Sequence, residues 1–230
     1  MAIKSILFNT EMVRAILDGR KSCTRRIVKP KQFVGLLPDK CKNGVPEEFL
    51  KEKKFMFKPY CDMTDSELIM ASYKEPYQQG DILYVRETWF KGLKRYMYRA
   101  DYTDVEKYYQ NGKEVSIKWH PSIHTPKEAA RIWLKVTDVQ VERLQEMKPV
   151  NVIKEGAYPD CWDCLNTYGE SGSQCCYGTE EQCSQCDEMM MEWEKLWNST
   201  IKKSDLDRYG WNVNPWVWVI EFERYEKPRK

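Results

Sequence analysis

The chain is poor in histidine: its 230 residues include two, His120 and His124. They lie four residues apart, a spacing that would place both on one face of a helix, but Pro121 between them disfavours a helix. No carboxylate motif accompanies them, which excludes zinc catalysis of the His-Glu-x-x-His kind. We expect both histidines to pack structurally, with a place at the rim of a pocket as the alternative.

Several other signatures are missing. The sequence has no Walker loop, no dinucleotide fingerprint, no Ser–His–Asp order and no Cys–His pair in a catalytic context. Nucleotide-driven motors, dehydrogenases and hydrolases with a conventional triad are therefore excluded. No apolar run approaches the ~20 residues of a membrane span, and the first residues lack the apolar core of a signal peptide. These absences predict a soluble, intracellular protein.

Charge is nearly balanced overall but unevenly distributed. The sequence has 37 Lys and Arg residues against 35 Asp and Glu, a net charge of +2. Residues 156–194 contain nine acidic side chains and no Lys or Arg, which leaves the rest of the chain at +11. A basic body suits a polyanionic partner, because Lys and Arg neutralise phosphates. The alternative is a solvated charged surface with no such partner.

Cysteine is concentrated in the acidic segment. Two Cys-x-x-Cys pairs, Cys161 with Cys164 and Cys183 with Cys186, are separated by 18 residues. This spacing is typical of a structural zinc site with four thiolates. Cys175 and Cys176 lie between the pairs, and either is an alternate ligand. The odd total of nine cysteines, without a secretory signal, argues against a disulfide framework. Redox chemistry and unligated thiols are the competing interpretations.

Hydrophobic periodicity predicts several strands and short helices. Asn9 or Thr10 is placed to cap the first helix, and Gly19 to end it. A bulge or bend is expected near Thr137 and Asp138, where the apolar parity of a long strand changes. The predicted strands are residues 3–8, 82–86, 131–142 and 216–224, and the predicted helices are 11–18, part of 145–155, and 188–198. Residues 19–26 are expected to form a cationic loop.

The order of these elements indicates the fold class. Several strands without a βαβ rhythm predict an α+β fold built around a small β-barrel. The aromatic content of 13% is enough for a sizeable core and excludes wholesale disorder. We expect one barrel domain from residues 1–156 and 188–226, with a poorly patterned insertion at 30–79, a Cys-rich zinc-binding insertion at 157–187 and a tail at 227–230.

Several motifs resemble one family. Residues 19–26 read G-R-K-S-C-T-R-R, residues 80–89 read G-D-I-L-Y-V-R-E-T-W, and residues 214–222 read N-P-W-V-W-V-I-E-F. Together with the stretch from His120 to Met147 and the I-K-E-G that ends at Gly156, they resemble the longer ASCH-domain proteins of phages and prophages. ASCH domains belong to the PUA-like β-barrel superfamily. The resemblance covers residues 3–29, 80–156 and 188–224.

The resemblance implies a cleft beside the first helix and a cytoplasmic protein of a bacterial or phage-infected cell. Members of the family are associated with RNA binding, and relatives in the superfamily hold modified bases. Some small ASCH proteins are amidohydrolases that remove the acyl group of N4-acetylcytidine, and one has been described as a ribonuclease. By resemblance to the amidohydrolases, the candidate catalytic residues here are Lys21, Thr24 and Glu155.

The chemistry of these residues has two interpretations. Thr24 is a potential nucleophile, Lys21 a potential base, and Glu155 a group that orients Lys21 or carries the proton. The competing view is that Lys21 contacts phosphate and Thr24 stabilises a loop. The candidate binding residues are Arg20, Arg25, Arg26, Arg86, Glu87 and Trp89. For Arg86 and Glu87, at the end of a strand, the alternative is a buried salt bridge, and for the tryptophans it is a place in the core.

The leading functional prediction is therefore a nucleic-acid or modified-nucleoside-binding protein, with RNA, DNA or a nucleoside as partner. An amidohydrolase acting on N4-acylated cytidine is the first alternative, and a ribonuclease the second. A different alternative makes the acidic zinc insertion a docking element for a protein partner. Structural Zn²⁺ is the expected metal.

Overall fold

A computed structural model describes residues 1–29, 70, 73–92, 95–103, 107–110, 112–157 and 184–228. A five-stranded sheet lies at its centre, with the strand order β1-β3-β8-β9-β2. β1 and β3 are parallel, and the other neighbours are antiparallel. The strands are β1 (Ile3–Leu7), β2 (Cys23–Ile27), β3 (Ile82–Arg86), β8 (Trp133–Arg143) and β9 (Trp216–Tyr225).

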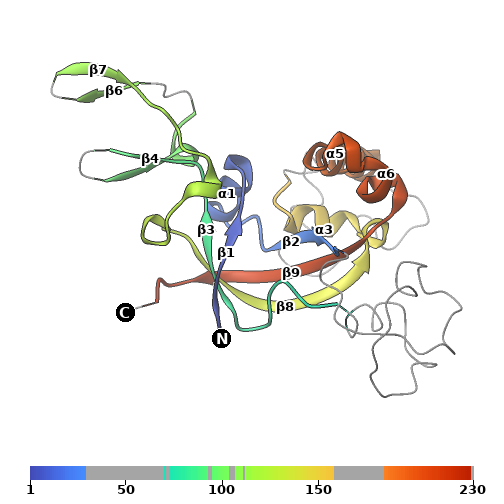
Figure 1. The fold of residues 1–230 in the computed structure, drawn as a ribbon. Coiled ribbons are helices and arrows are strands. Elements are labelled where there is room, and N and C mark those ends of the chain that lie inside the picture. Colours follow the sequence, from blue (N-terminus) through green and yellow to red (C-terminus); the bar gives the residue numbers. More distant parts are fainter. Residues whose placement is uncertain are drawn as a thin grey trace, which may run out of the picture.

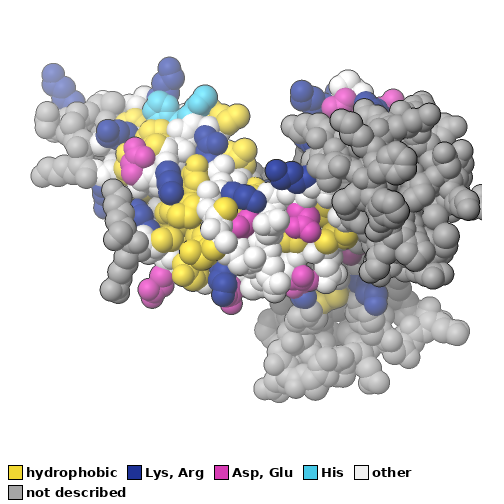
Figure 2. Space-filling model, turned by 60° about the horizontal axis from the view of Figure 1, so that its bottom comes forward, with side chains coloured by type: hydrophobic (Ala, Val, Ile, Leu, Met, Phe, Trp, Pro, Cys, Tyr) yellow, Lys and Arg dark blue, Asp and Glu magenta, His cyan; other side chains and the backbone are white. Residues whose placement is uncertain are grey.

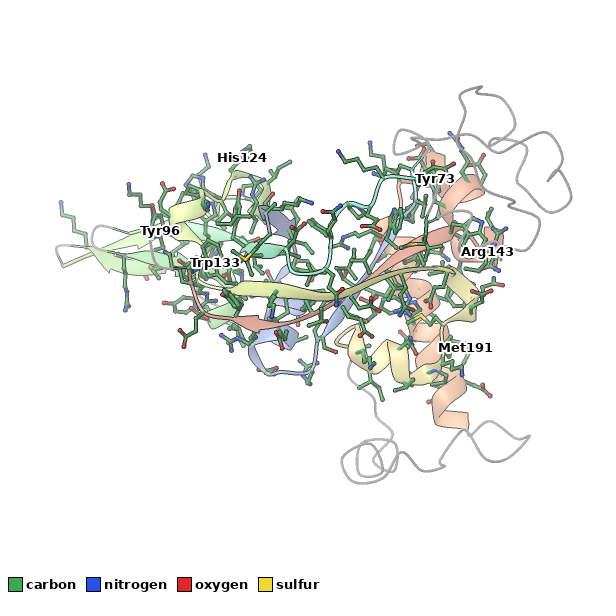
Figure 3. All side chains as sticks on the ribbon, turned by 90° about the horizontal axis from the view of Figure 1, so that it is seen from below. Tyr73, Tyr96, His124, Trp133, Arg143 and Met191 are labelled. Carbon is green, nitrogen blue, oxygen red and sulfur yellow. The ribbon has the colours of Figure 1, made fainter. Side chains whose placement is uncertain are left out.

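The long ladder between β8 and β9 forms the spine of the molecule (Figures 1 and 3). Its register shifts between Val136 and Asp138, so the predicted irregularity in this strand is confirmed. The alternation of β9 is confirmed as well, because Trp216, Trp218, Ile220 and Phe222 all belong to the main buried cluster. Those side chains share one face because strand residues two apart point the same way.

Helices pack on the sheet. Asn9 caps α1 (Thr10–Leu17): its side-chain oxygen accepts a hydrogen bond from the Met12 amide at 2.8 Å. α3 (Pro149–Lys154) and α5 (Ser184–Thr200) pack against each other and share a second buried cluster, which includes Val152, Trp193 and Trp197. α6 (Leu206–Tyr209) follows, with the 3-10 turns Lys203–Asp205 and Trp211–Val213 on either side. In Figure 1, α3, α5 and α6 lie together above one end of the β8–β9 ladder.

Two hairpins project from the opposite end of the molecule (Figure 1). They are β4 (Trp89–Lys91) with β5 (Tyr96–Tyr98), and β6 (Lys107–Gln110) with β7 (Lys113–Ser116). The 3-10 turns Arg99–Asp101 and Ser122–His124 belong to the same region, while Lys127–Ala129 and Leu144–Glu146 flank β8. We call the described residues between 89 and 127 the hairpin arm.

The α+β class is confirmed, but two expectations are corrected. Residues 23–26 of the expected cationic loop belong to β2, because Arg25 is buried against acidic partners far away in sequence. The sheet is not closed into a barrel: in the described part of the chain β1 and β2 are its two edges. A side chain links these edges instead of a backbone ladder, since Arg26 donates to the Leu7 carbonyl at 3.0 Å.

Both predicted insertions, residues 30–79 and 157–187, lie mostly outside the described residues. Among the helices that are described, none is long and apolar enough to cross a bilayer.

Candidate functional site

A cavity of about 220 Å³ lies where the two edges of the sheet approach each other. Leu7 and Phe8 at the end of β1 line it together with residues of β2, so it occupies the opening that a closed barrel would have sealed. α1, Glu155 and α5 complete its walls. The lining residues are Leu7, Phe8, Asn9, Met12, Lys21, Thr24, Arg25, Arg26, Glu155, Trp193, Leu196, Trp197 and Thr200.

Lys21 and Glu155 form a buried ion pair in the wall of this cavity. The Lys21 ammonium donates to Glu155 Oε2 at 2.8 Å and to the Glu155 backbone carbonyl at 2.7 Å. The two side chains are 1% and 3% exposed. A β-bridge joins the same two residues, and the Ser22 amide donates to the Lys154 carbonyl at 2.9 Å. The pair that the family resemblance predicts is therefore a direct contact across 134 positions of sequence.

Gly156 makes this close approach sterically possible. It ends α3 at a φ of +87°, in the left-handed region that favours glycine. A Cβ atom there would lie 2.7 Å from the Ala15 Cβ and 2.9 Å from the Lys21 Cβ. Both distances are shorter than any normal carbon–carbon contact, so a larger residue would push the end of α3 away from Lys21.

Arg25 holds Glu155 from the other side. Its guanidinium lies 3.2 Å from Glu155 Oε1 and 2.6 Å from Glu142 Oε1 on β8. Burial alone would lower the pKa of Arg25, but the charges of Glu155 and Glu142 outweigh it and raise that pKa. The two cations and two carboxylates of this cluster, Lys21, Arg25, Glu142 and Glu155, are mutually neutralised.

Arg26 adds a positive charge that this cluster does not cancel. It donates to the carbonyls of Arg25 and Leu7, and within the described residues no carboxylate lies at ion-pair distance from it. The Phe8 ring has two cations near it, with Lys21 Nζ at 5.4 Å and Arg26 Cζ at 5.5 Å from its centroid. The cavity therefore combines an aromatic wall with an unneutralised cation.

Thr24 places a hydroxyl group on the same cavity. It lies in β2 opposite Ile220 of β9 and is 2% exposed. Lys21 comes three residues earlier, across the short turn that leads from α1 into β2. The structure thus brings all three candidate catalytic residues, Lys21, Thr24 and Glu155, to the lining of one cavity.

Trp193 and Trp197 of α5 form the apolar side. Both are 6% exposed. The Trp197 indole donates to the Tyr209 carbonyl at 2.9 Å, whereas the Trp193 Nε1–H is buried with no hydrogen-bond partner in the described part of the chain. A buried donor without a partner costs free energy. An acceptor atom on a bound ligand would satisfy it.

The remaining candidate binding residues are not among those that line the cavity. Arg20 donates to the Gly156 carbonyl and to Asp18. Arg86, at the end of β3, has a buried Nε without a partner among the described residues. Glu87 forms a two-bond ion pair with Arg131, at 2.9 and 3.0 Å, which is the salt bridge considered as its alternative. Burial raises the pKa of Glu87, and Arg131 offsets only part of that rise.

The aromatic candidate Trp89 belongs to the hairpin arm. Its ring stacks on His120 with centroids 4.9 Å apart, and the two residues exchange backbone hydrogen bonds. His120 therefore has the structural packing contact that we expected, although its own side chain is exposed. His124 ends the 3-10 turn that follows, so the two histidines do not share a helix.

Glu142 and Trp193 are site residues that the sequence did not point to. Glu142 follows the β8 bulge at a position that looks like an ordinary solvent-facing strand residue. Trp193 reads as one of several apolar positions on a helix. Arg25 lies between Thr24 and Arg26, so no alternation with apolar residues marked β2, and the charge suggested a loop.

The predicted zinc ligands lie outside the described residues, which include neither Cys161, Cys164, Cys183 and the alternates Cys175 and Cys176 nor the side chain of Cys186. In the described residues no three His, Cys, Asp or Glu side chains group as metal ligands would. Cys23 is a buried free thiol, and burial, followed by the charge of Glu155, raises its pKa to about 12. This thiol is therefore inert as a nucleophile at neutral pH.

Comparison of the chain with protein-family models, with curated proteins and with solved structures finds no match.

Proposed function

We propose that this protein binds nucleic acid or a modified nucleoside, and that the cavity beside Lys21, Thr24 and Glu155 receives the base. The proposal rests chiefly on one observation: a single cavity combines aromatic walls, a buried polar cluster and the unneutralised cation Arg26. Aromatic rings stack on bases of any sequence, and an arginine attracts phosphate. The unpartnered Trp193 indole is a further donor for a base carbonyl or an acyl oxygen.

Binding of nucleosides and short polynucleotides tests this proposal. We expect Arg26→Gln to weaken binding of a labelled polynucleotide about tenfold at low salt, because a phosphate contact is lost. Trp193→Phe replaces the indole by a smaller aromatic ring without an N–H donor, and it should weaken binding several-fold. Arg208→Gln, an exposed arginine of α6, is the matched control and should bind normally. Absence of binding to RNA, DNA and nucleosides at low salt would contradict the proposal.

A second candidate function is hydrolysis of the amide bond in N4-acylated cytidine. It is favoured by the 2.8 Å contact between Lys21 and Glu155 beside Thr24. Lys21 passes a proton to Glu155 Oε2, and the resulting amine takes the proton of the Thr24 hydroxyl. Thr24 Oγ then bonds to the acyl carbon, the C–N bond breaks, and the Glu155 proton goes to the departing nitrogen. Water hydrolyses the acyl-threonine ester and releases the carboxylic acid.

Mass spectrometry of the products distinguishes this reaction from binding alone. The protein would be incubated with N4-acetylcytidine and N4-acetyldeoxycytidine. Lys21→Ala and Thr24→Val should lose release of the free nucleoside, while Lys154→Ala, the neighbouring half-buried lysine, should retain it. Circular dichroism of each variant checks that the fold is intact. Release by Thr24→Val at the normal rate would exclude Thr24 as the nucleophile.

The family resemblance and the metal are also proposals. We propose that the chain is an ASCH-domain protein of the PUA-like superfamily with an opened barrel, from the cytoplasm of a bacterial or phage-infected cell. We further propose that Cys161, Cys164, Cys183 and Cys186 hold a structural Zn²⁺, since four thiolates leave no open position for catalysis. Elemental analysis should find about one zinc ion per chain, lost in the variant with Cys161→Ser and Cys164→Ser. The same variant tests whether the acidic insertion docks a protein partner.

A further inference from the structure

The hairpin arm carries aromatic side chains that the core does not cover. Trp89, Tyr96, Tyr102 and Trp119 are all half-buried, and none belongs to the three buried clusters of the described residues. A two-stranded ribbon lacks the second layer needed to bury such rings. These rings contact one another instead. The ring centroids of Trp89 and Tyr96 are 5.5 Å apart, and those of Tyr102 and Trp119 are 6.2 Å apart. Ile123, on the same arm, is 56% exposed.

The same arm has an excess of unpaired positive charge. Lys91, Arg95, Lys113, Lys118 and Lys127 are exposed and have no carboxylate at ion-pair distance among the described residues. Both described acids of the arm are already neutralised, because Asp101 pairs with Arg131 and Glu114 with Lys107. On the left of Figure 2, Lys and Arg side chains surround the histidines and a group of hydrophobic side chains.

This composition distinguishes between two kinds of partner. Protein interfaces are enriched in aromatic residues and arginine but depleted in lysine. The unpaired cations of the arm are mostly lysines, and they are interspersed along the chain with half-buried rings. That combination is typical of surfaces for single-stranded nucleic acid, in which cations follow the phosphates and rings stack on successive bases.

α1 connects the arm to the cavity. Met12 of this helix lines the cavity. Arg14, on the same helix, donates to the carbonyls of Ala100 and Tyr102 in the arm, at 3.0 and 2.7 Å. In Figure 1, α1 lies between the hairpins and the helices that surround the cavity. A single-stranded polynucleotide that leaves the cavity past α1 therefore reaches the arm without crossing the sheet.

We infer that the hairpin arm binds the single-stranded polynucleotide that flanks the base held in the cavity. The inference rests on the proposed function and makes its ligand more specific: a single-stranded polynucleotide, not a free nucleoside. It requires that affinity grow with strand length, because each added nucleotide gains a phosphate contact or a stacked base on the arm.

Fluorescence anisotropy with labelled oligouridylate of 4 and 12 nucleotides, RNA and DNA, tests the inference on the full chain. The 12-nucleotide strand should bind at least tenfold more tightly than the 4-nucleotide strand. The double variant Lys113→Gln with Lys118→Gln should lower the slope of log affinity against log salt by about 1.4, which is about 0.7 for each lost contact with a single strand. Lys74→Gln with Lys227→Gln makes the same charge change outside the arm and should leave the slope unchanged.

A stacking variant gives a second, charge-independent readout. Trp119→Ala should lower the affinity for the 12-nucleotide strand about fivefold or more, and leave the affinity for a mononucleoside unchanged. Equal affinity for both strand lengths, or equal effects of the arm and control pairs, would overturn the inference. If mononucleosides bind in that case, the proposed function stands and the arm is left as a surface for a protein. If neither nucleosides nor oligonucleotides bind, the proposed function fails as well.

Discussion

Two buried carboxylates, Glu155 and Glu87, lie in different parts of the fold, and each is 2% exposed. Glu155 lies between two cations that are themselves buried, Lys21 and Arg25. Glu87 has one partner, Arg131, whose side chain is 27% exposed and also pairs with Asp101. The first carboxylate lines a cavity, whereas the second follows β3 and pairs with a residue just before β8.

The comparison shows that a buried charge does not by itself define a functional site. Both carboxylates satisfy the same physical requirement, that an ion taken out of water be paired and hydrogen-bonded. What distinguishes Glu155 is its surroundings: a cavity, a threonine hydroxyl and an indole donor without a partner. Glu87 has the features of an ion pair that stabilises the structure.

The largest expected effect follows from removing the anion at the cavity. Glu155→Leu leaves Lys21 and Arg25 buried with one remaining carboxylate, Glu142. Stranding a buried charge costs ~3–5 kcal/mol of the free energy of unfolding. Urea titration followed by tryptophan fluorescence measures this. A loss of less than ~1 kcal/mol in the free energy of unfolding would mean that water reaches both Lys21 and Arg25 in the variant.

The corresponding change at the other carboxylate should cost less. Arg131→Met removes the cation from Glu87, but the partly exposed position of Arg131 lets water replace it in part. We expect a loss of about 2 kcal/mol, the cost of a buried polar group that loses its partner. The same urea titration applies. A loss larger than that of Glu155→Leu would reverse the ranking of the two sites.

Glu87 should also make stability depend on pH. Burial raises the pKa of Glu87 in the folded state. Above pH ~4.3, the usual pKa of glutamate, Glu87 therefore carries a proton more often in the folded protein than in the unfolded chain. The Glu87 contribution therefore falls as pH rises from there through the folded pKa. Titrations at several pH values between 4 and 8 should show this decline in the wild type and a smaller one in Glu87→Gln. An unchanged decline in the variant would assign it to another group.

The smallest effect is expected next to the cavity but outside it. Lys154 pairs with Glu221 at 3.4 Å, and both side chains are about 40% exposed. Exposed ion pairs contribute ~0–1 kcal/mol because solvent screens them. Lys154→Ala should therefore unfold at almost the wild-type urea concentration. A loss approaching that of Glu155→Leu would show that the region responds to any change of charge, not to the buried pair.

Local periodicity was enough to predict most of the central sheet. The apolar alternation of residues 216–224 and the change of parity near Asp138 predicted β9 and the bulge in β8. Asn9 and Gly19 marked the ends of α1 because a cap and a left-handed turn need those residue types. These features depend on residues close together in sequence, so a pattern is sufficient.

Features that depend on distant partners were missed. Arg25 looked like a loop residue because Glu142 and Glu155, which allow its burial, lie 117 and 130 positions away. The hairpins of the arm have short strands without a buried face, so no alternation signals them. Glu155 was reached through the family resemblance alone. Barrel closure was predicted wrongly because strand patterns carry no information on which edges pair.

The position of β9 has a consequence for the order in which the protein is made. β9 is the last described strand to be synthesised, yet it lies inside the sheet between β8 and β2. β2 has no other strand partner among the described residues, so Thr24 and Arg25 stay without their ladder until residues 216–225 leave the ribosome. Such distant pairings are slow to form. The cavity therefore forms only after residues 216–225 have been made, nearly 200 positions after Thr24.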